Sequence, residues 1–239
     1  MDDETYIQLL LTDSNLPTGI DNLHNHAHSA LPFTSDAHTL VCVLSESAQI
    51  DQTLAALTTL DRAYESMTLN HVTRRASTAQ GTALLTLYAR AFALSSTSKV
   101  IPTLIDSLKL AVRRGETHGH LPVCWGVLTA ALGLSLSRTQ HLALFLHARS
   151  ILSAAVRMNT IGPYLAQQIL LSDVKPLVDA VVAECCDLRS GLLMTGEENI
   201  DSNLDPDEMT YATGPASTWP LGEIVAIRHD LLHSRIFNS

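Results

Sequence analysis

The stretch "RTQHLALFLHARSILSAAVRM", at residues 138–158, is among the longest and most apolar segments of the chain. Together with the preceding serine it predicts a long helix, and its apolar content places that helix in the protein core. Arg149 and Arg157 interrupt this apolar character. They need partners if they are buried, because an unpaired internal charge is costly. Otherwise the guanidinium group of one or both arginines reaches solvent, because the long aliphatic part of the side chain can lie along apolar surface while its charged end stays in water.

The segments on the N-terminal side of this stretch also have helical patterns. Asp51 can act as the N-cap of a helix over residues 51–69, and Pro102 and Pro122 can begin two further helices. Gly81 lies near the middle of the helical segment 71–94. A glycine costs about 1 kcal/mol relative to alanine in a helix, so Gly81 indicates either close packing against a neighbour or a helix break.

Helical patterns continue on the C-terminal side. Pro163 can begin a helix over residues 164–188, and Pro176 should kink or divide it. Apolar residues form one stripe along this segment: Leu170, Val174, Val178, Val181 and Cys185. Residues 221–233 predict a last short helix. Strand patterns are scarce throughout, so we expect an all-α, single-domain bundle of roughly eight to ten helices spanning residues 1–239.

Composition limits the classes of function. Of the 239 residues, 46% are hydrophobic and 16% are charged, which is enough apolar content for a sizeable core. The net charge of −9, without a basic cluster, argues against nucleic acid as a partner. The longest apolar run is shorter than a bilayer span, and the N-terminus is acidic, so we expect a cytoplasmic protein with no membrane association. Residues 190–220, rich in acids and proline, predict a flexible insertion.

The four cysteines show no zinc-finger or C-x-x-C spacing, and we interpret them as core residues rather than as metal or redox groups. Histidines offer the main candidates for metal ligands. Tracts of alternating histidines occur as "HNHAH" (His24, His26 and His28) and as "HGH" (His118 and His120). The alternative interpretation of both tracts is that they are solvated histidines in flexible loops.

Near the C-terminus, His229 and His233 flank the sequence "HDLLH", which is similar to the H-E-x-x-H motif of zinc peptidases. The acid is Asp rather than Glu, and no third ligand is evident, so a peptidase is disfavoured. The sequence also lacks the nucleophile-elbow and phosphate-loop motifs of common hydrolases and nucleotide-binding enzymes. We therefore do not expect an enzyme.

Five segments together resemble the UreF family, all-helical accessory proteins that help to deliver nickel to urease. In chain order they are "TDSNLPTG" (12–19), "RRASTAQGTALL" (74–85), "HLPVCWGVLTAALGLS" (120–135), "FLHARSILSAAVRMNTIGPYLAQQILL" (145–171) and "AIRHDLLHSRIFNS" (226–239). The last two are the most specific. The family normally continues after its "LPTG" element with a stretch of the type G-F-x-x-S-x-G-L-E, whereas this chain continues with "IDNLHNHAHSALPF" (20–33).

The resemblance implies a non-catalytic, homodimeric scaffold that joins a UreD/UreH-like accessory protein and recruits a UreG-like GTPase for nickel insertion into apo-urease. It implies no tightly bound cofactor, with nickel only in transit. The positions that match the family pattern and are candidates for partner binding are Arg157, Gly162, Gln167, Arg228, His229, Ser234, Arg235 and Phe237. In this interpretation residues 221–239 form a C-terminal helix and docking tail, and Arg157 or Arg235 are formal candidates for an arginine finger.

Two alternatives stay open at this point. One is a metal-binding or metal-dependent helical protein that uses His24, His26, His28, His229 or His233. The other is an unrelated helical interaction module.

Overall fold

The computed structural model describes residues 19–44, 49–93, 99–193 and 214–227. In these ranges the chain forms nine α-helices, one short π-helical turn and no strand, which confirms the predicted all-α class. The elements are α2 (Gly19–Val43), α3 (Ile50–Met67), α4 (His71–Leu87), η2 (Tyr88–Phe92), α5 (Val100–Arg113), α6 (Leu121–Ala131), α7 (Leu136–Arg157), α8 (Pro163–Ser172), α9 (Val174–Cys185) and α11 (Pro220–Ile227). None of these described helices is long and apolar enough to cross a membrane.

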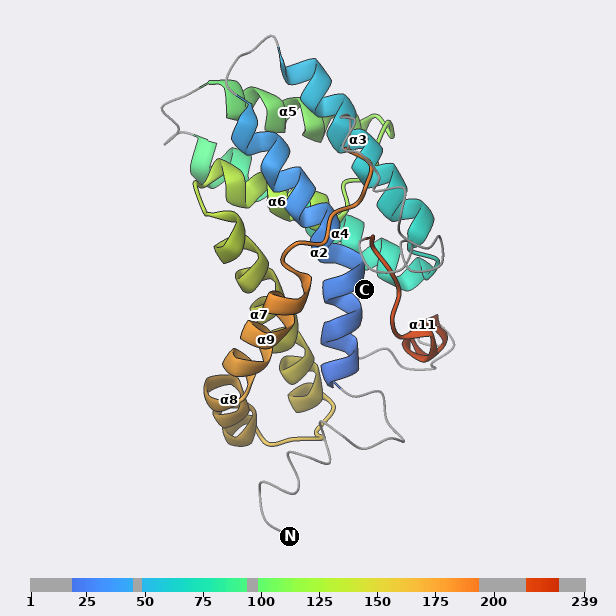
Figure 1. Cartoon of the computed structure of the whole chain (residues 1–239), viewed down its shortest axis with the longest axis vertical. Helices are drawn as coiled ribbons and strands as arrows, with labels where there is room; N and C mark the ends of the chain where they lie inside the picture. The colour runs from blue at the N-terminus through green and yellow to red at the C-terminus, as the bar shows by residue number, and fades with distance from the viewer. Residues whose placement is uncertain (1–18, 45–48, 94–98, 194–213, 228–239) are drawn as a thin grey trace, which may run out of the picture.

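Helix α2 runs through the middle of the bundle (Figure 1) and has more buried residues than any other described helix. Every residue from 30 to 38 is buried. This differs from the sequence prediction in two ways. The alternative interpretation of the "HNHAH" tract as a flexible loop is wrong, because the tract lies on α2. The helix over 138–158 was placed in the core, but α7 buries only one face, whose fully buried residues are Thr139, Gln140, Leu144 and Ala148.

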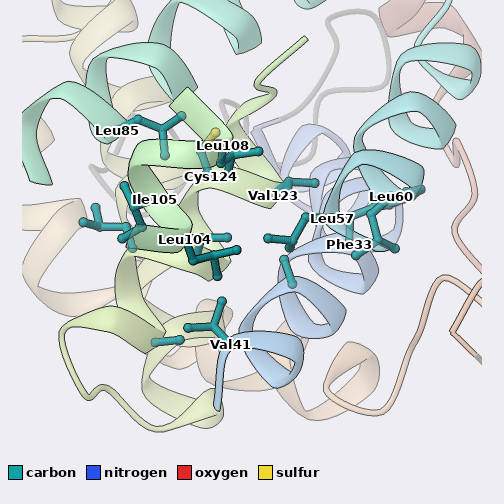
Figure 2. Close-up of a cluster of buried hydrophobic side chains, with 14 of the residues drawn as sticks. Phe33, Val41, Leu57, Leu60, Leu85, Leu104, Ile105, Leu108, Val123 and Cys124 are labelled. Atoms are coloured by element: carbon teal, nitrogen blue, oxygen red, sulfur yellow. The ribbon is translucent and has the colours of Figure 1, made fainter. Parts of the chain in front are cut away.

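Two hydrophobic clusters share α2. One surrounds its C-terminal half, where Phe33 and Val41 pack with side chains of α3, α4, α5 and α6. Figure 2 shows this cluster, with Leu57, Leu104 and neighbouring apolar side chains directed towards one another. The second cluster surrounds the N-terminal half of α2 and contains residues of α7, α8 and α9. A single helix therefore belongs to both parts of the core.

The buried polar residues of α2 are hydrogen-bonded. Ser35 accepts a bond from the side-chain amide of Gln140 (2.9 Å), and His38 Nε2 lies 2.8 Å from the carbonyl oxygen of Leu134. Thr34 donates to the carbonyl of Pro122 at 3.2 Å. Since burying an unpaired polar group is costly, these bonds allow α2 to be buried on all sides despite its polar residues.

Most predicted helix starts are confirmed. Pro122 and Pro163 lie in the first turns of α6 and α8. The break expected at Pro176 occurs three residues earlier, since α8 ends at Ser172 and α9 begins at Val174. This places the proline in the first turn of α9, where its missing N–H leaves no helical bond unmade. The prediction of Asp51 as an N-cap is wrong, because α3 begins at Ile50.

Gly81 marks a close approach rather than a helix break. A Cβ atom built at this position would lie 2.1 Å from the carbonyl oxygen of Gly119 and 2.9 Å from the carbonyl carbon of His120. The loop that precedes α6 thus crosses α4 where no side chain intervenes. Of the two alternatives offered by the sequence, close packing is the correct one.

That loop is fixed by a buried carboxylate. Asp61 of α3 is 1% exposed and accepts four hydrogen bonds from residues 117–120. The donors are the Thr117 hydroxyl (2.6 Å) and the backbone N–H groups of His118 (2.7 Å), Gly119 (2.9 Å) and His120 (2.7 Å). These bonds join α3 to the start of α6.

The C-terminal part of the described chain is hydrogen-bonded to α2 and to the N-cap of α4. The Asn25 side-chain oxygen accepts hydrogen bonds from the backbone N–H groups of Thr218 (2.8 Å) and Trp219 (3.2 Å), and Asn70 donates to the carbonyl of Glu223. Of the predicted flexible insertion, residues 194–213 lie outside the described residues, and so does the predicted helix beyond residue 227.

Candidate functional site

Three of the predicted partner-binding residues lie on consecutive elements at one end of the molecule (Figure 1). Arg157 is the last residue of α7, Gly162 is the N-cap of α8, and Gln167 lies on α8; all three are exposed. The connecting turn is compact, since Asn159 adopts a positive φ of 57°. The structure therefore exposes all three residues around the turn that joins α7 to α8.

The outer side of α8 carries exposed apolar side chains beside Gln167. Tyr164 is 88% exposed and Leu171 is 73% exposed, whereas Ala166 and Ile169 on the opposite side are buried. Tyr164, Gln167, Gln168 and Leu171 follow the i, i+3, i+4, i+7 spacing of one helix face. We call these four residues the α8 face. The exposure of Tyr164 and Leu171 could not be predicted from the sequence, because the segment has the pattern of an ordinary apolar helix.

Arginines extend this surface along α7. Arg149 and Arg157 are both exposed, which confirms the solvent-reaching alternative, and they line a shallow depression with Ser150, Ser153 and Ala154. Two guanidinium groups on a chain of net charge −9 form a local basic strip. Guanidinium groups of this kind suit carboxylate or phosphate groups, to which arginine can donate two parallel hydrogen bonds.

The histidines of "HNHAH" do not gather at one point. His24 and His28 lie one turn apart on α2, with ring centroids 6.3 Å apart. They face the last turn of α9, where a carboxylate oxygen of Glu184 is 3.6 Å from His24 Nδ1. His26 points elsewhere and stacks on His147 of α7, with ring centroids 3.8 Å apart. A helix separates alternate residues by about 200°, so the three imidazoles cannot converge as they would along a strand.

The His26–His147 stack lines an apolar cavity of about 360 Å³ between α2, α4, α6 and α7. His147 Nε2 lies 2.6 Å from the side-chain oxygen of Asn22. Burial lowers the pKa of His26 to about 4, and burial together with the neighbouring His26 lowers the pKa of His147 well below its ordinary value. Both rings are therefore neutral at pH 7. Nothing in the sequence linked these two histidines, which are 121 positions apart.

Potential metal ligands do converge elsewhere. Among the described residues, one group of three or more His, Cys, Asp or Glu side chains has its ligand atoms within 4.8 Å of one another: Glu65, His118 and His120. The "HGH" tract thus meets a carboxylate from α3, which sequence spacing could not indicate. The remaining predicted site residues, Arg228, His229, His233, Ser234, Arg235 and Phe237, lie outside the described residues.

Comparison with known proteins gives the family of this chain. The sequence profile of the UreF family matches residues 20–172. "Urease accessory protein 6" of Cryptococcus neoformans is 40% identical over an alignment of 208 residues that covers 80% of this chain and 66% of that protein. An "uncharacterized urease accessory protein UreF-like" of Schizosaccharomyces pombe is 28% identical over 99% of this chain and 97% of its own length. "Urease accessory protein F" of Oryza sativa is 31% identical over 153 residues, or 64% of this chain and 51% of the rice protein.

The profile match includes α2 through α8 and therefore the first hydrophobic cluster and the α8 face, whereas the α9 residues of the second cluster lie beyond it. It also begins at residue 20, so the "IDNLHNHAHSALPF" stretch that departs from the expected family pattern lies inside the matched region. Since the profile covers more than half of the chain, this chain belongs to the UreF family of urease accessory proteins.

Proposed function

We propose that this protein is a non-catalytic, cytoplasmic scaffold of urease maturation. It binds a UreD/UreH-like accessory protein, recruits a UreG-like GTPase, and acts as a homodimer in nickel delivery to apo-urease. Membership of the UreF family supports the general role. The relatives named as urease accessory proteins support it further. Nickel is the cargo in this proposal, and no tightly bound cofactor is required.

The observation that carries the proposal is the α8 face. A tyrosine that is 88% exposed and a leucine that is 73% exposed lie two turns apart on the same face of α8, beside a glutamine that can form hydrogen bonds. Aromatic and aliphatic side chains of this kind contribute much of the binding free energy when a partner removes them from water. The α8 face therefore suits the docking of a partner protein.

The arginines of α7 favour an acidic partner surface next to the α8 face. Arg149 and Arg157 are exposed along the same depression. Charged groups at the rim of an interface mainly accelerate association and fix the orientation of the partner. The sequence has no phosphate-binding loop of its own, which suits a protein that recruits a GTPase rather than acting as one.

The test is a binding measurement between the purified full chain and the UreD/UreH-like and UreG-like proteins of the same organism. Tyr164→Ala and Leu171→Ala should each weaken binding of at least one partner about tenfold or more, which is the effect of removing an interface hot spot. Leu69→Ala is the matched control, since Leu69 is 80% exposed and lies outside α7 and α8. It should leave binding unchanged.

Failure of the wild-type chain to bind either protein would refute the scaffold proposal. Equal binding by wild type, Tyr164→Ala and Leu171→Ala would instead leave the scaffold role in place and remove the α8 face from it. Light scattering coupled to size exclusion measures the mass of the chain alone, and a monomer at all concentrations would contradict the homodimer.

A further inference from the structure

A carboxylate and two imidazoles from separate parts of the chain meet beside the start of α6. Glu65 comes from the last turn of α3, and His118 and His120 from the loop before α6. Their potential ligand atoms lie within 4.8 Å of one another. We propose that Glu65, His118 and His120 form a binding site for one divalent transition-metal ion of the Zn²⁺ or Ni²⁺ type.

His120 is already oriented as a metal ligand would be. Its ring is fully buried, with Nε2 at 2.7 Å from Glu65 Oε2 and Nδ1 at 3.2 Å from the Ser77 hydroxyl. When Nε2 binds a metal, Nδ1 must carry the ring proton, and the Ser77 hydroxyl oxygen can accept a hydrogen bond from this N–H. Such a hydrogen bond to the second ring nitrogen fixes the orientation of most metal-binding histidines.

The backbone of the loop is held in place independently of any ion. Asp61 accepts hydrogen bonds from the N–H groups of His118, Gly119 and His120 at 2.7–2.9 Å. Both histidine Cα positions are thus fixed by a buried carboxylate. A site whose ligands are held in place before binding loses less conformational entropy when the ion binds.

The two carboxylate oxygens of Glu65 face different side chains, those of Arg74 and His120. Its Oε1 lies 3.1 Å from the Arg74 guanidinium, and its Oε2 lies at His120. Arg74 also donates to the carbonyl of Thr68, which holds the guanidinium in place beside Oε1. Oε2 is therefore the oxygen that would bind the ion, which would replace its present contact with His120 Nε2. The charge of Arg74 opposes a cation, so we expect an exchangeable site rather than a permanently filled one.

The ligand chemistry selects the class of ion. Two imidazole nitrogens with one carboxylate oxygen suit Zn²⁺ and Ni²⁺, whereas Mg²⁺ and Ca²⁺ prefer oxygen ligands alone. Three protein ligands leave at least one coordination position for water or for an incoming ligand. His118 is exposed, so the ion can enter from solvent. The inference rests on this geometry and does not depend on the proposed scaffold function.

The experiment uses the full chain without an affinity tag, stripped with a chelator and titrated separately with Zn²⁺ and Ni²⁺ by calorimetry. His118→Ala removes an exposed ligand and is expected to preserve the fold; Glu65→Gln is a second, near-isosteric variant. The control is His141→Ala, because His141 is also partly exposed and also has a carboxylate partner, Asp179 at 2.6 Å. Circular dichroism checks that every variant is folded.

We expect the wild type and His141→Ala to bind one equivalent with the same affinity. His118→Ala and Glu65→Gln should each weaken that binding by about tenfold or more, since loss even of a supporting group typically costs 10–100-fold. The inference is overturned if the wild type binds neither ion. It is equally overturned if both variants bind with wild-type affinity, because the ion would then be held by other histidines.

Discussion

The buried carboxylate of Asp61 should be the most sensitive polar group of the described structure. It is 1% exposed and accepts one hydroxyl and three backbone hydrogen bonds from residues 117–120. Its Oδ2 accepts three of these bonds and its Oδ1 accepts the N–H of His120. We consider the substitution Asp61→Asn, which keeps the shape of the side chain and removes its charge.

The amide oxygen of asparagine can take the position of Oδ2, but its NH₂ group then faces the N–H of His120. One buried donor is left unsatisfied, which costs about 1–3 kcal/mol. The remaining bonds lose a charged acceptor, and bonds to charged groups contribute about 1.5–3 kcal/mol compared with about 1 kcal/mol for neutral ones. Some relaxation of the loop offsets part of this loss. We expect the free energy of unfolding to fall by about 2–4 kcal/mol.

Urea unfolding monitored by circular dichroism measures this difference. The control is Asp106→Asn on α5, where the side chain is exposed and the substitution should change stability by about 0.5 kcal/mol or less. If Asp61→Asn were no more destabilising than Asp106→Asn, the carboxylate would not anchor the loop, and the orientation argued for His120 would lose its support.

Two further predictions concern packing and pH. Gly81→Ala should destabilise the protein by about 1–3 kcal/mol in the same unfolding assay, because its Cβ would meet Gly119 O at 2.1 Å. Gly214→Ala, whose added Cβ would have no atom within 4 Å, should be nearly neutral, and equal stability of the two variants would contradict the close approach. In the folded protein the pKa of His26 is lowered to about 4, and that of His147 is also lowered. The unfolded chain therefore binds more protons than the folded one between pH 6.5 and about 4. As a result, the free energy of unfolding should fall as pH falls through this window. His26→Phe should reduce the pH dependence of the unfolding free energy by about one proton. If the slope of unfolding free energy against pH were unchanged in this variant, the lowered pKa of His26 would be refuted.

The parts of the fold that could be predicted are those with a one-sided apolar pattern. In α5, Leu104, Leu108 and Ala111 recur at helical spacing, and all three are buried. The stripe on α9 was equally readable, with Val178 and Val181 fully buried. These helices lie at the outside of the bundle, so each has one buried and one exposed face. Apolar residues therefore recur along their sequences with the helical period of 3.6 residues.

Helix α2 could not be predicted in this way. It is buried on all sides between residues 30 and 38, so no face is distinguished by polarity. Its buried polar residues, among them Ser35 and His38, read as surface residues until their partners are known, and those partners are about 100 positions away. Pro32 inside the helix and the preceding histidines added to the impression of a loop.

The candidate sites show the same limit. Gln167 and Arg157 were indicated by family resemblance, yet the exposure of Tyr164 depends on how α8 packs, which only the structure provides. The meeting of Glu65 with His118 joins residues 53 positions apart in the chain. Local spacing identified two of the three ligands but could not supply the carboxylate.

The proline of α2 also explains how the C-terminal segment is held. Pro32 has no N–H, so it cannot donate to the carbonyl of His28, four residues earlier. That carbonyl instead accepts a hydrogen bond from the backbone N–H of Ala216 at 3.2 Å. The residue that weakens the helix thus provides an acceptor for the segment leading to α11. With the two bonds that Asn25 accepts, it fixes the start of α11 against the central helix. The carbonyl that Pro32 leaves unpaired within α2 therefore helps to position the segment that leads to α11.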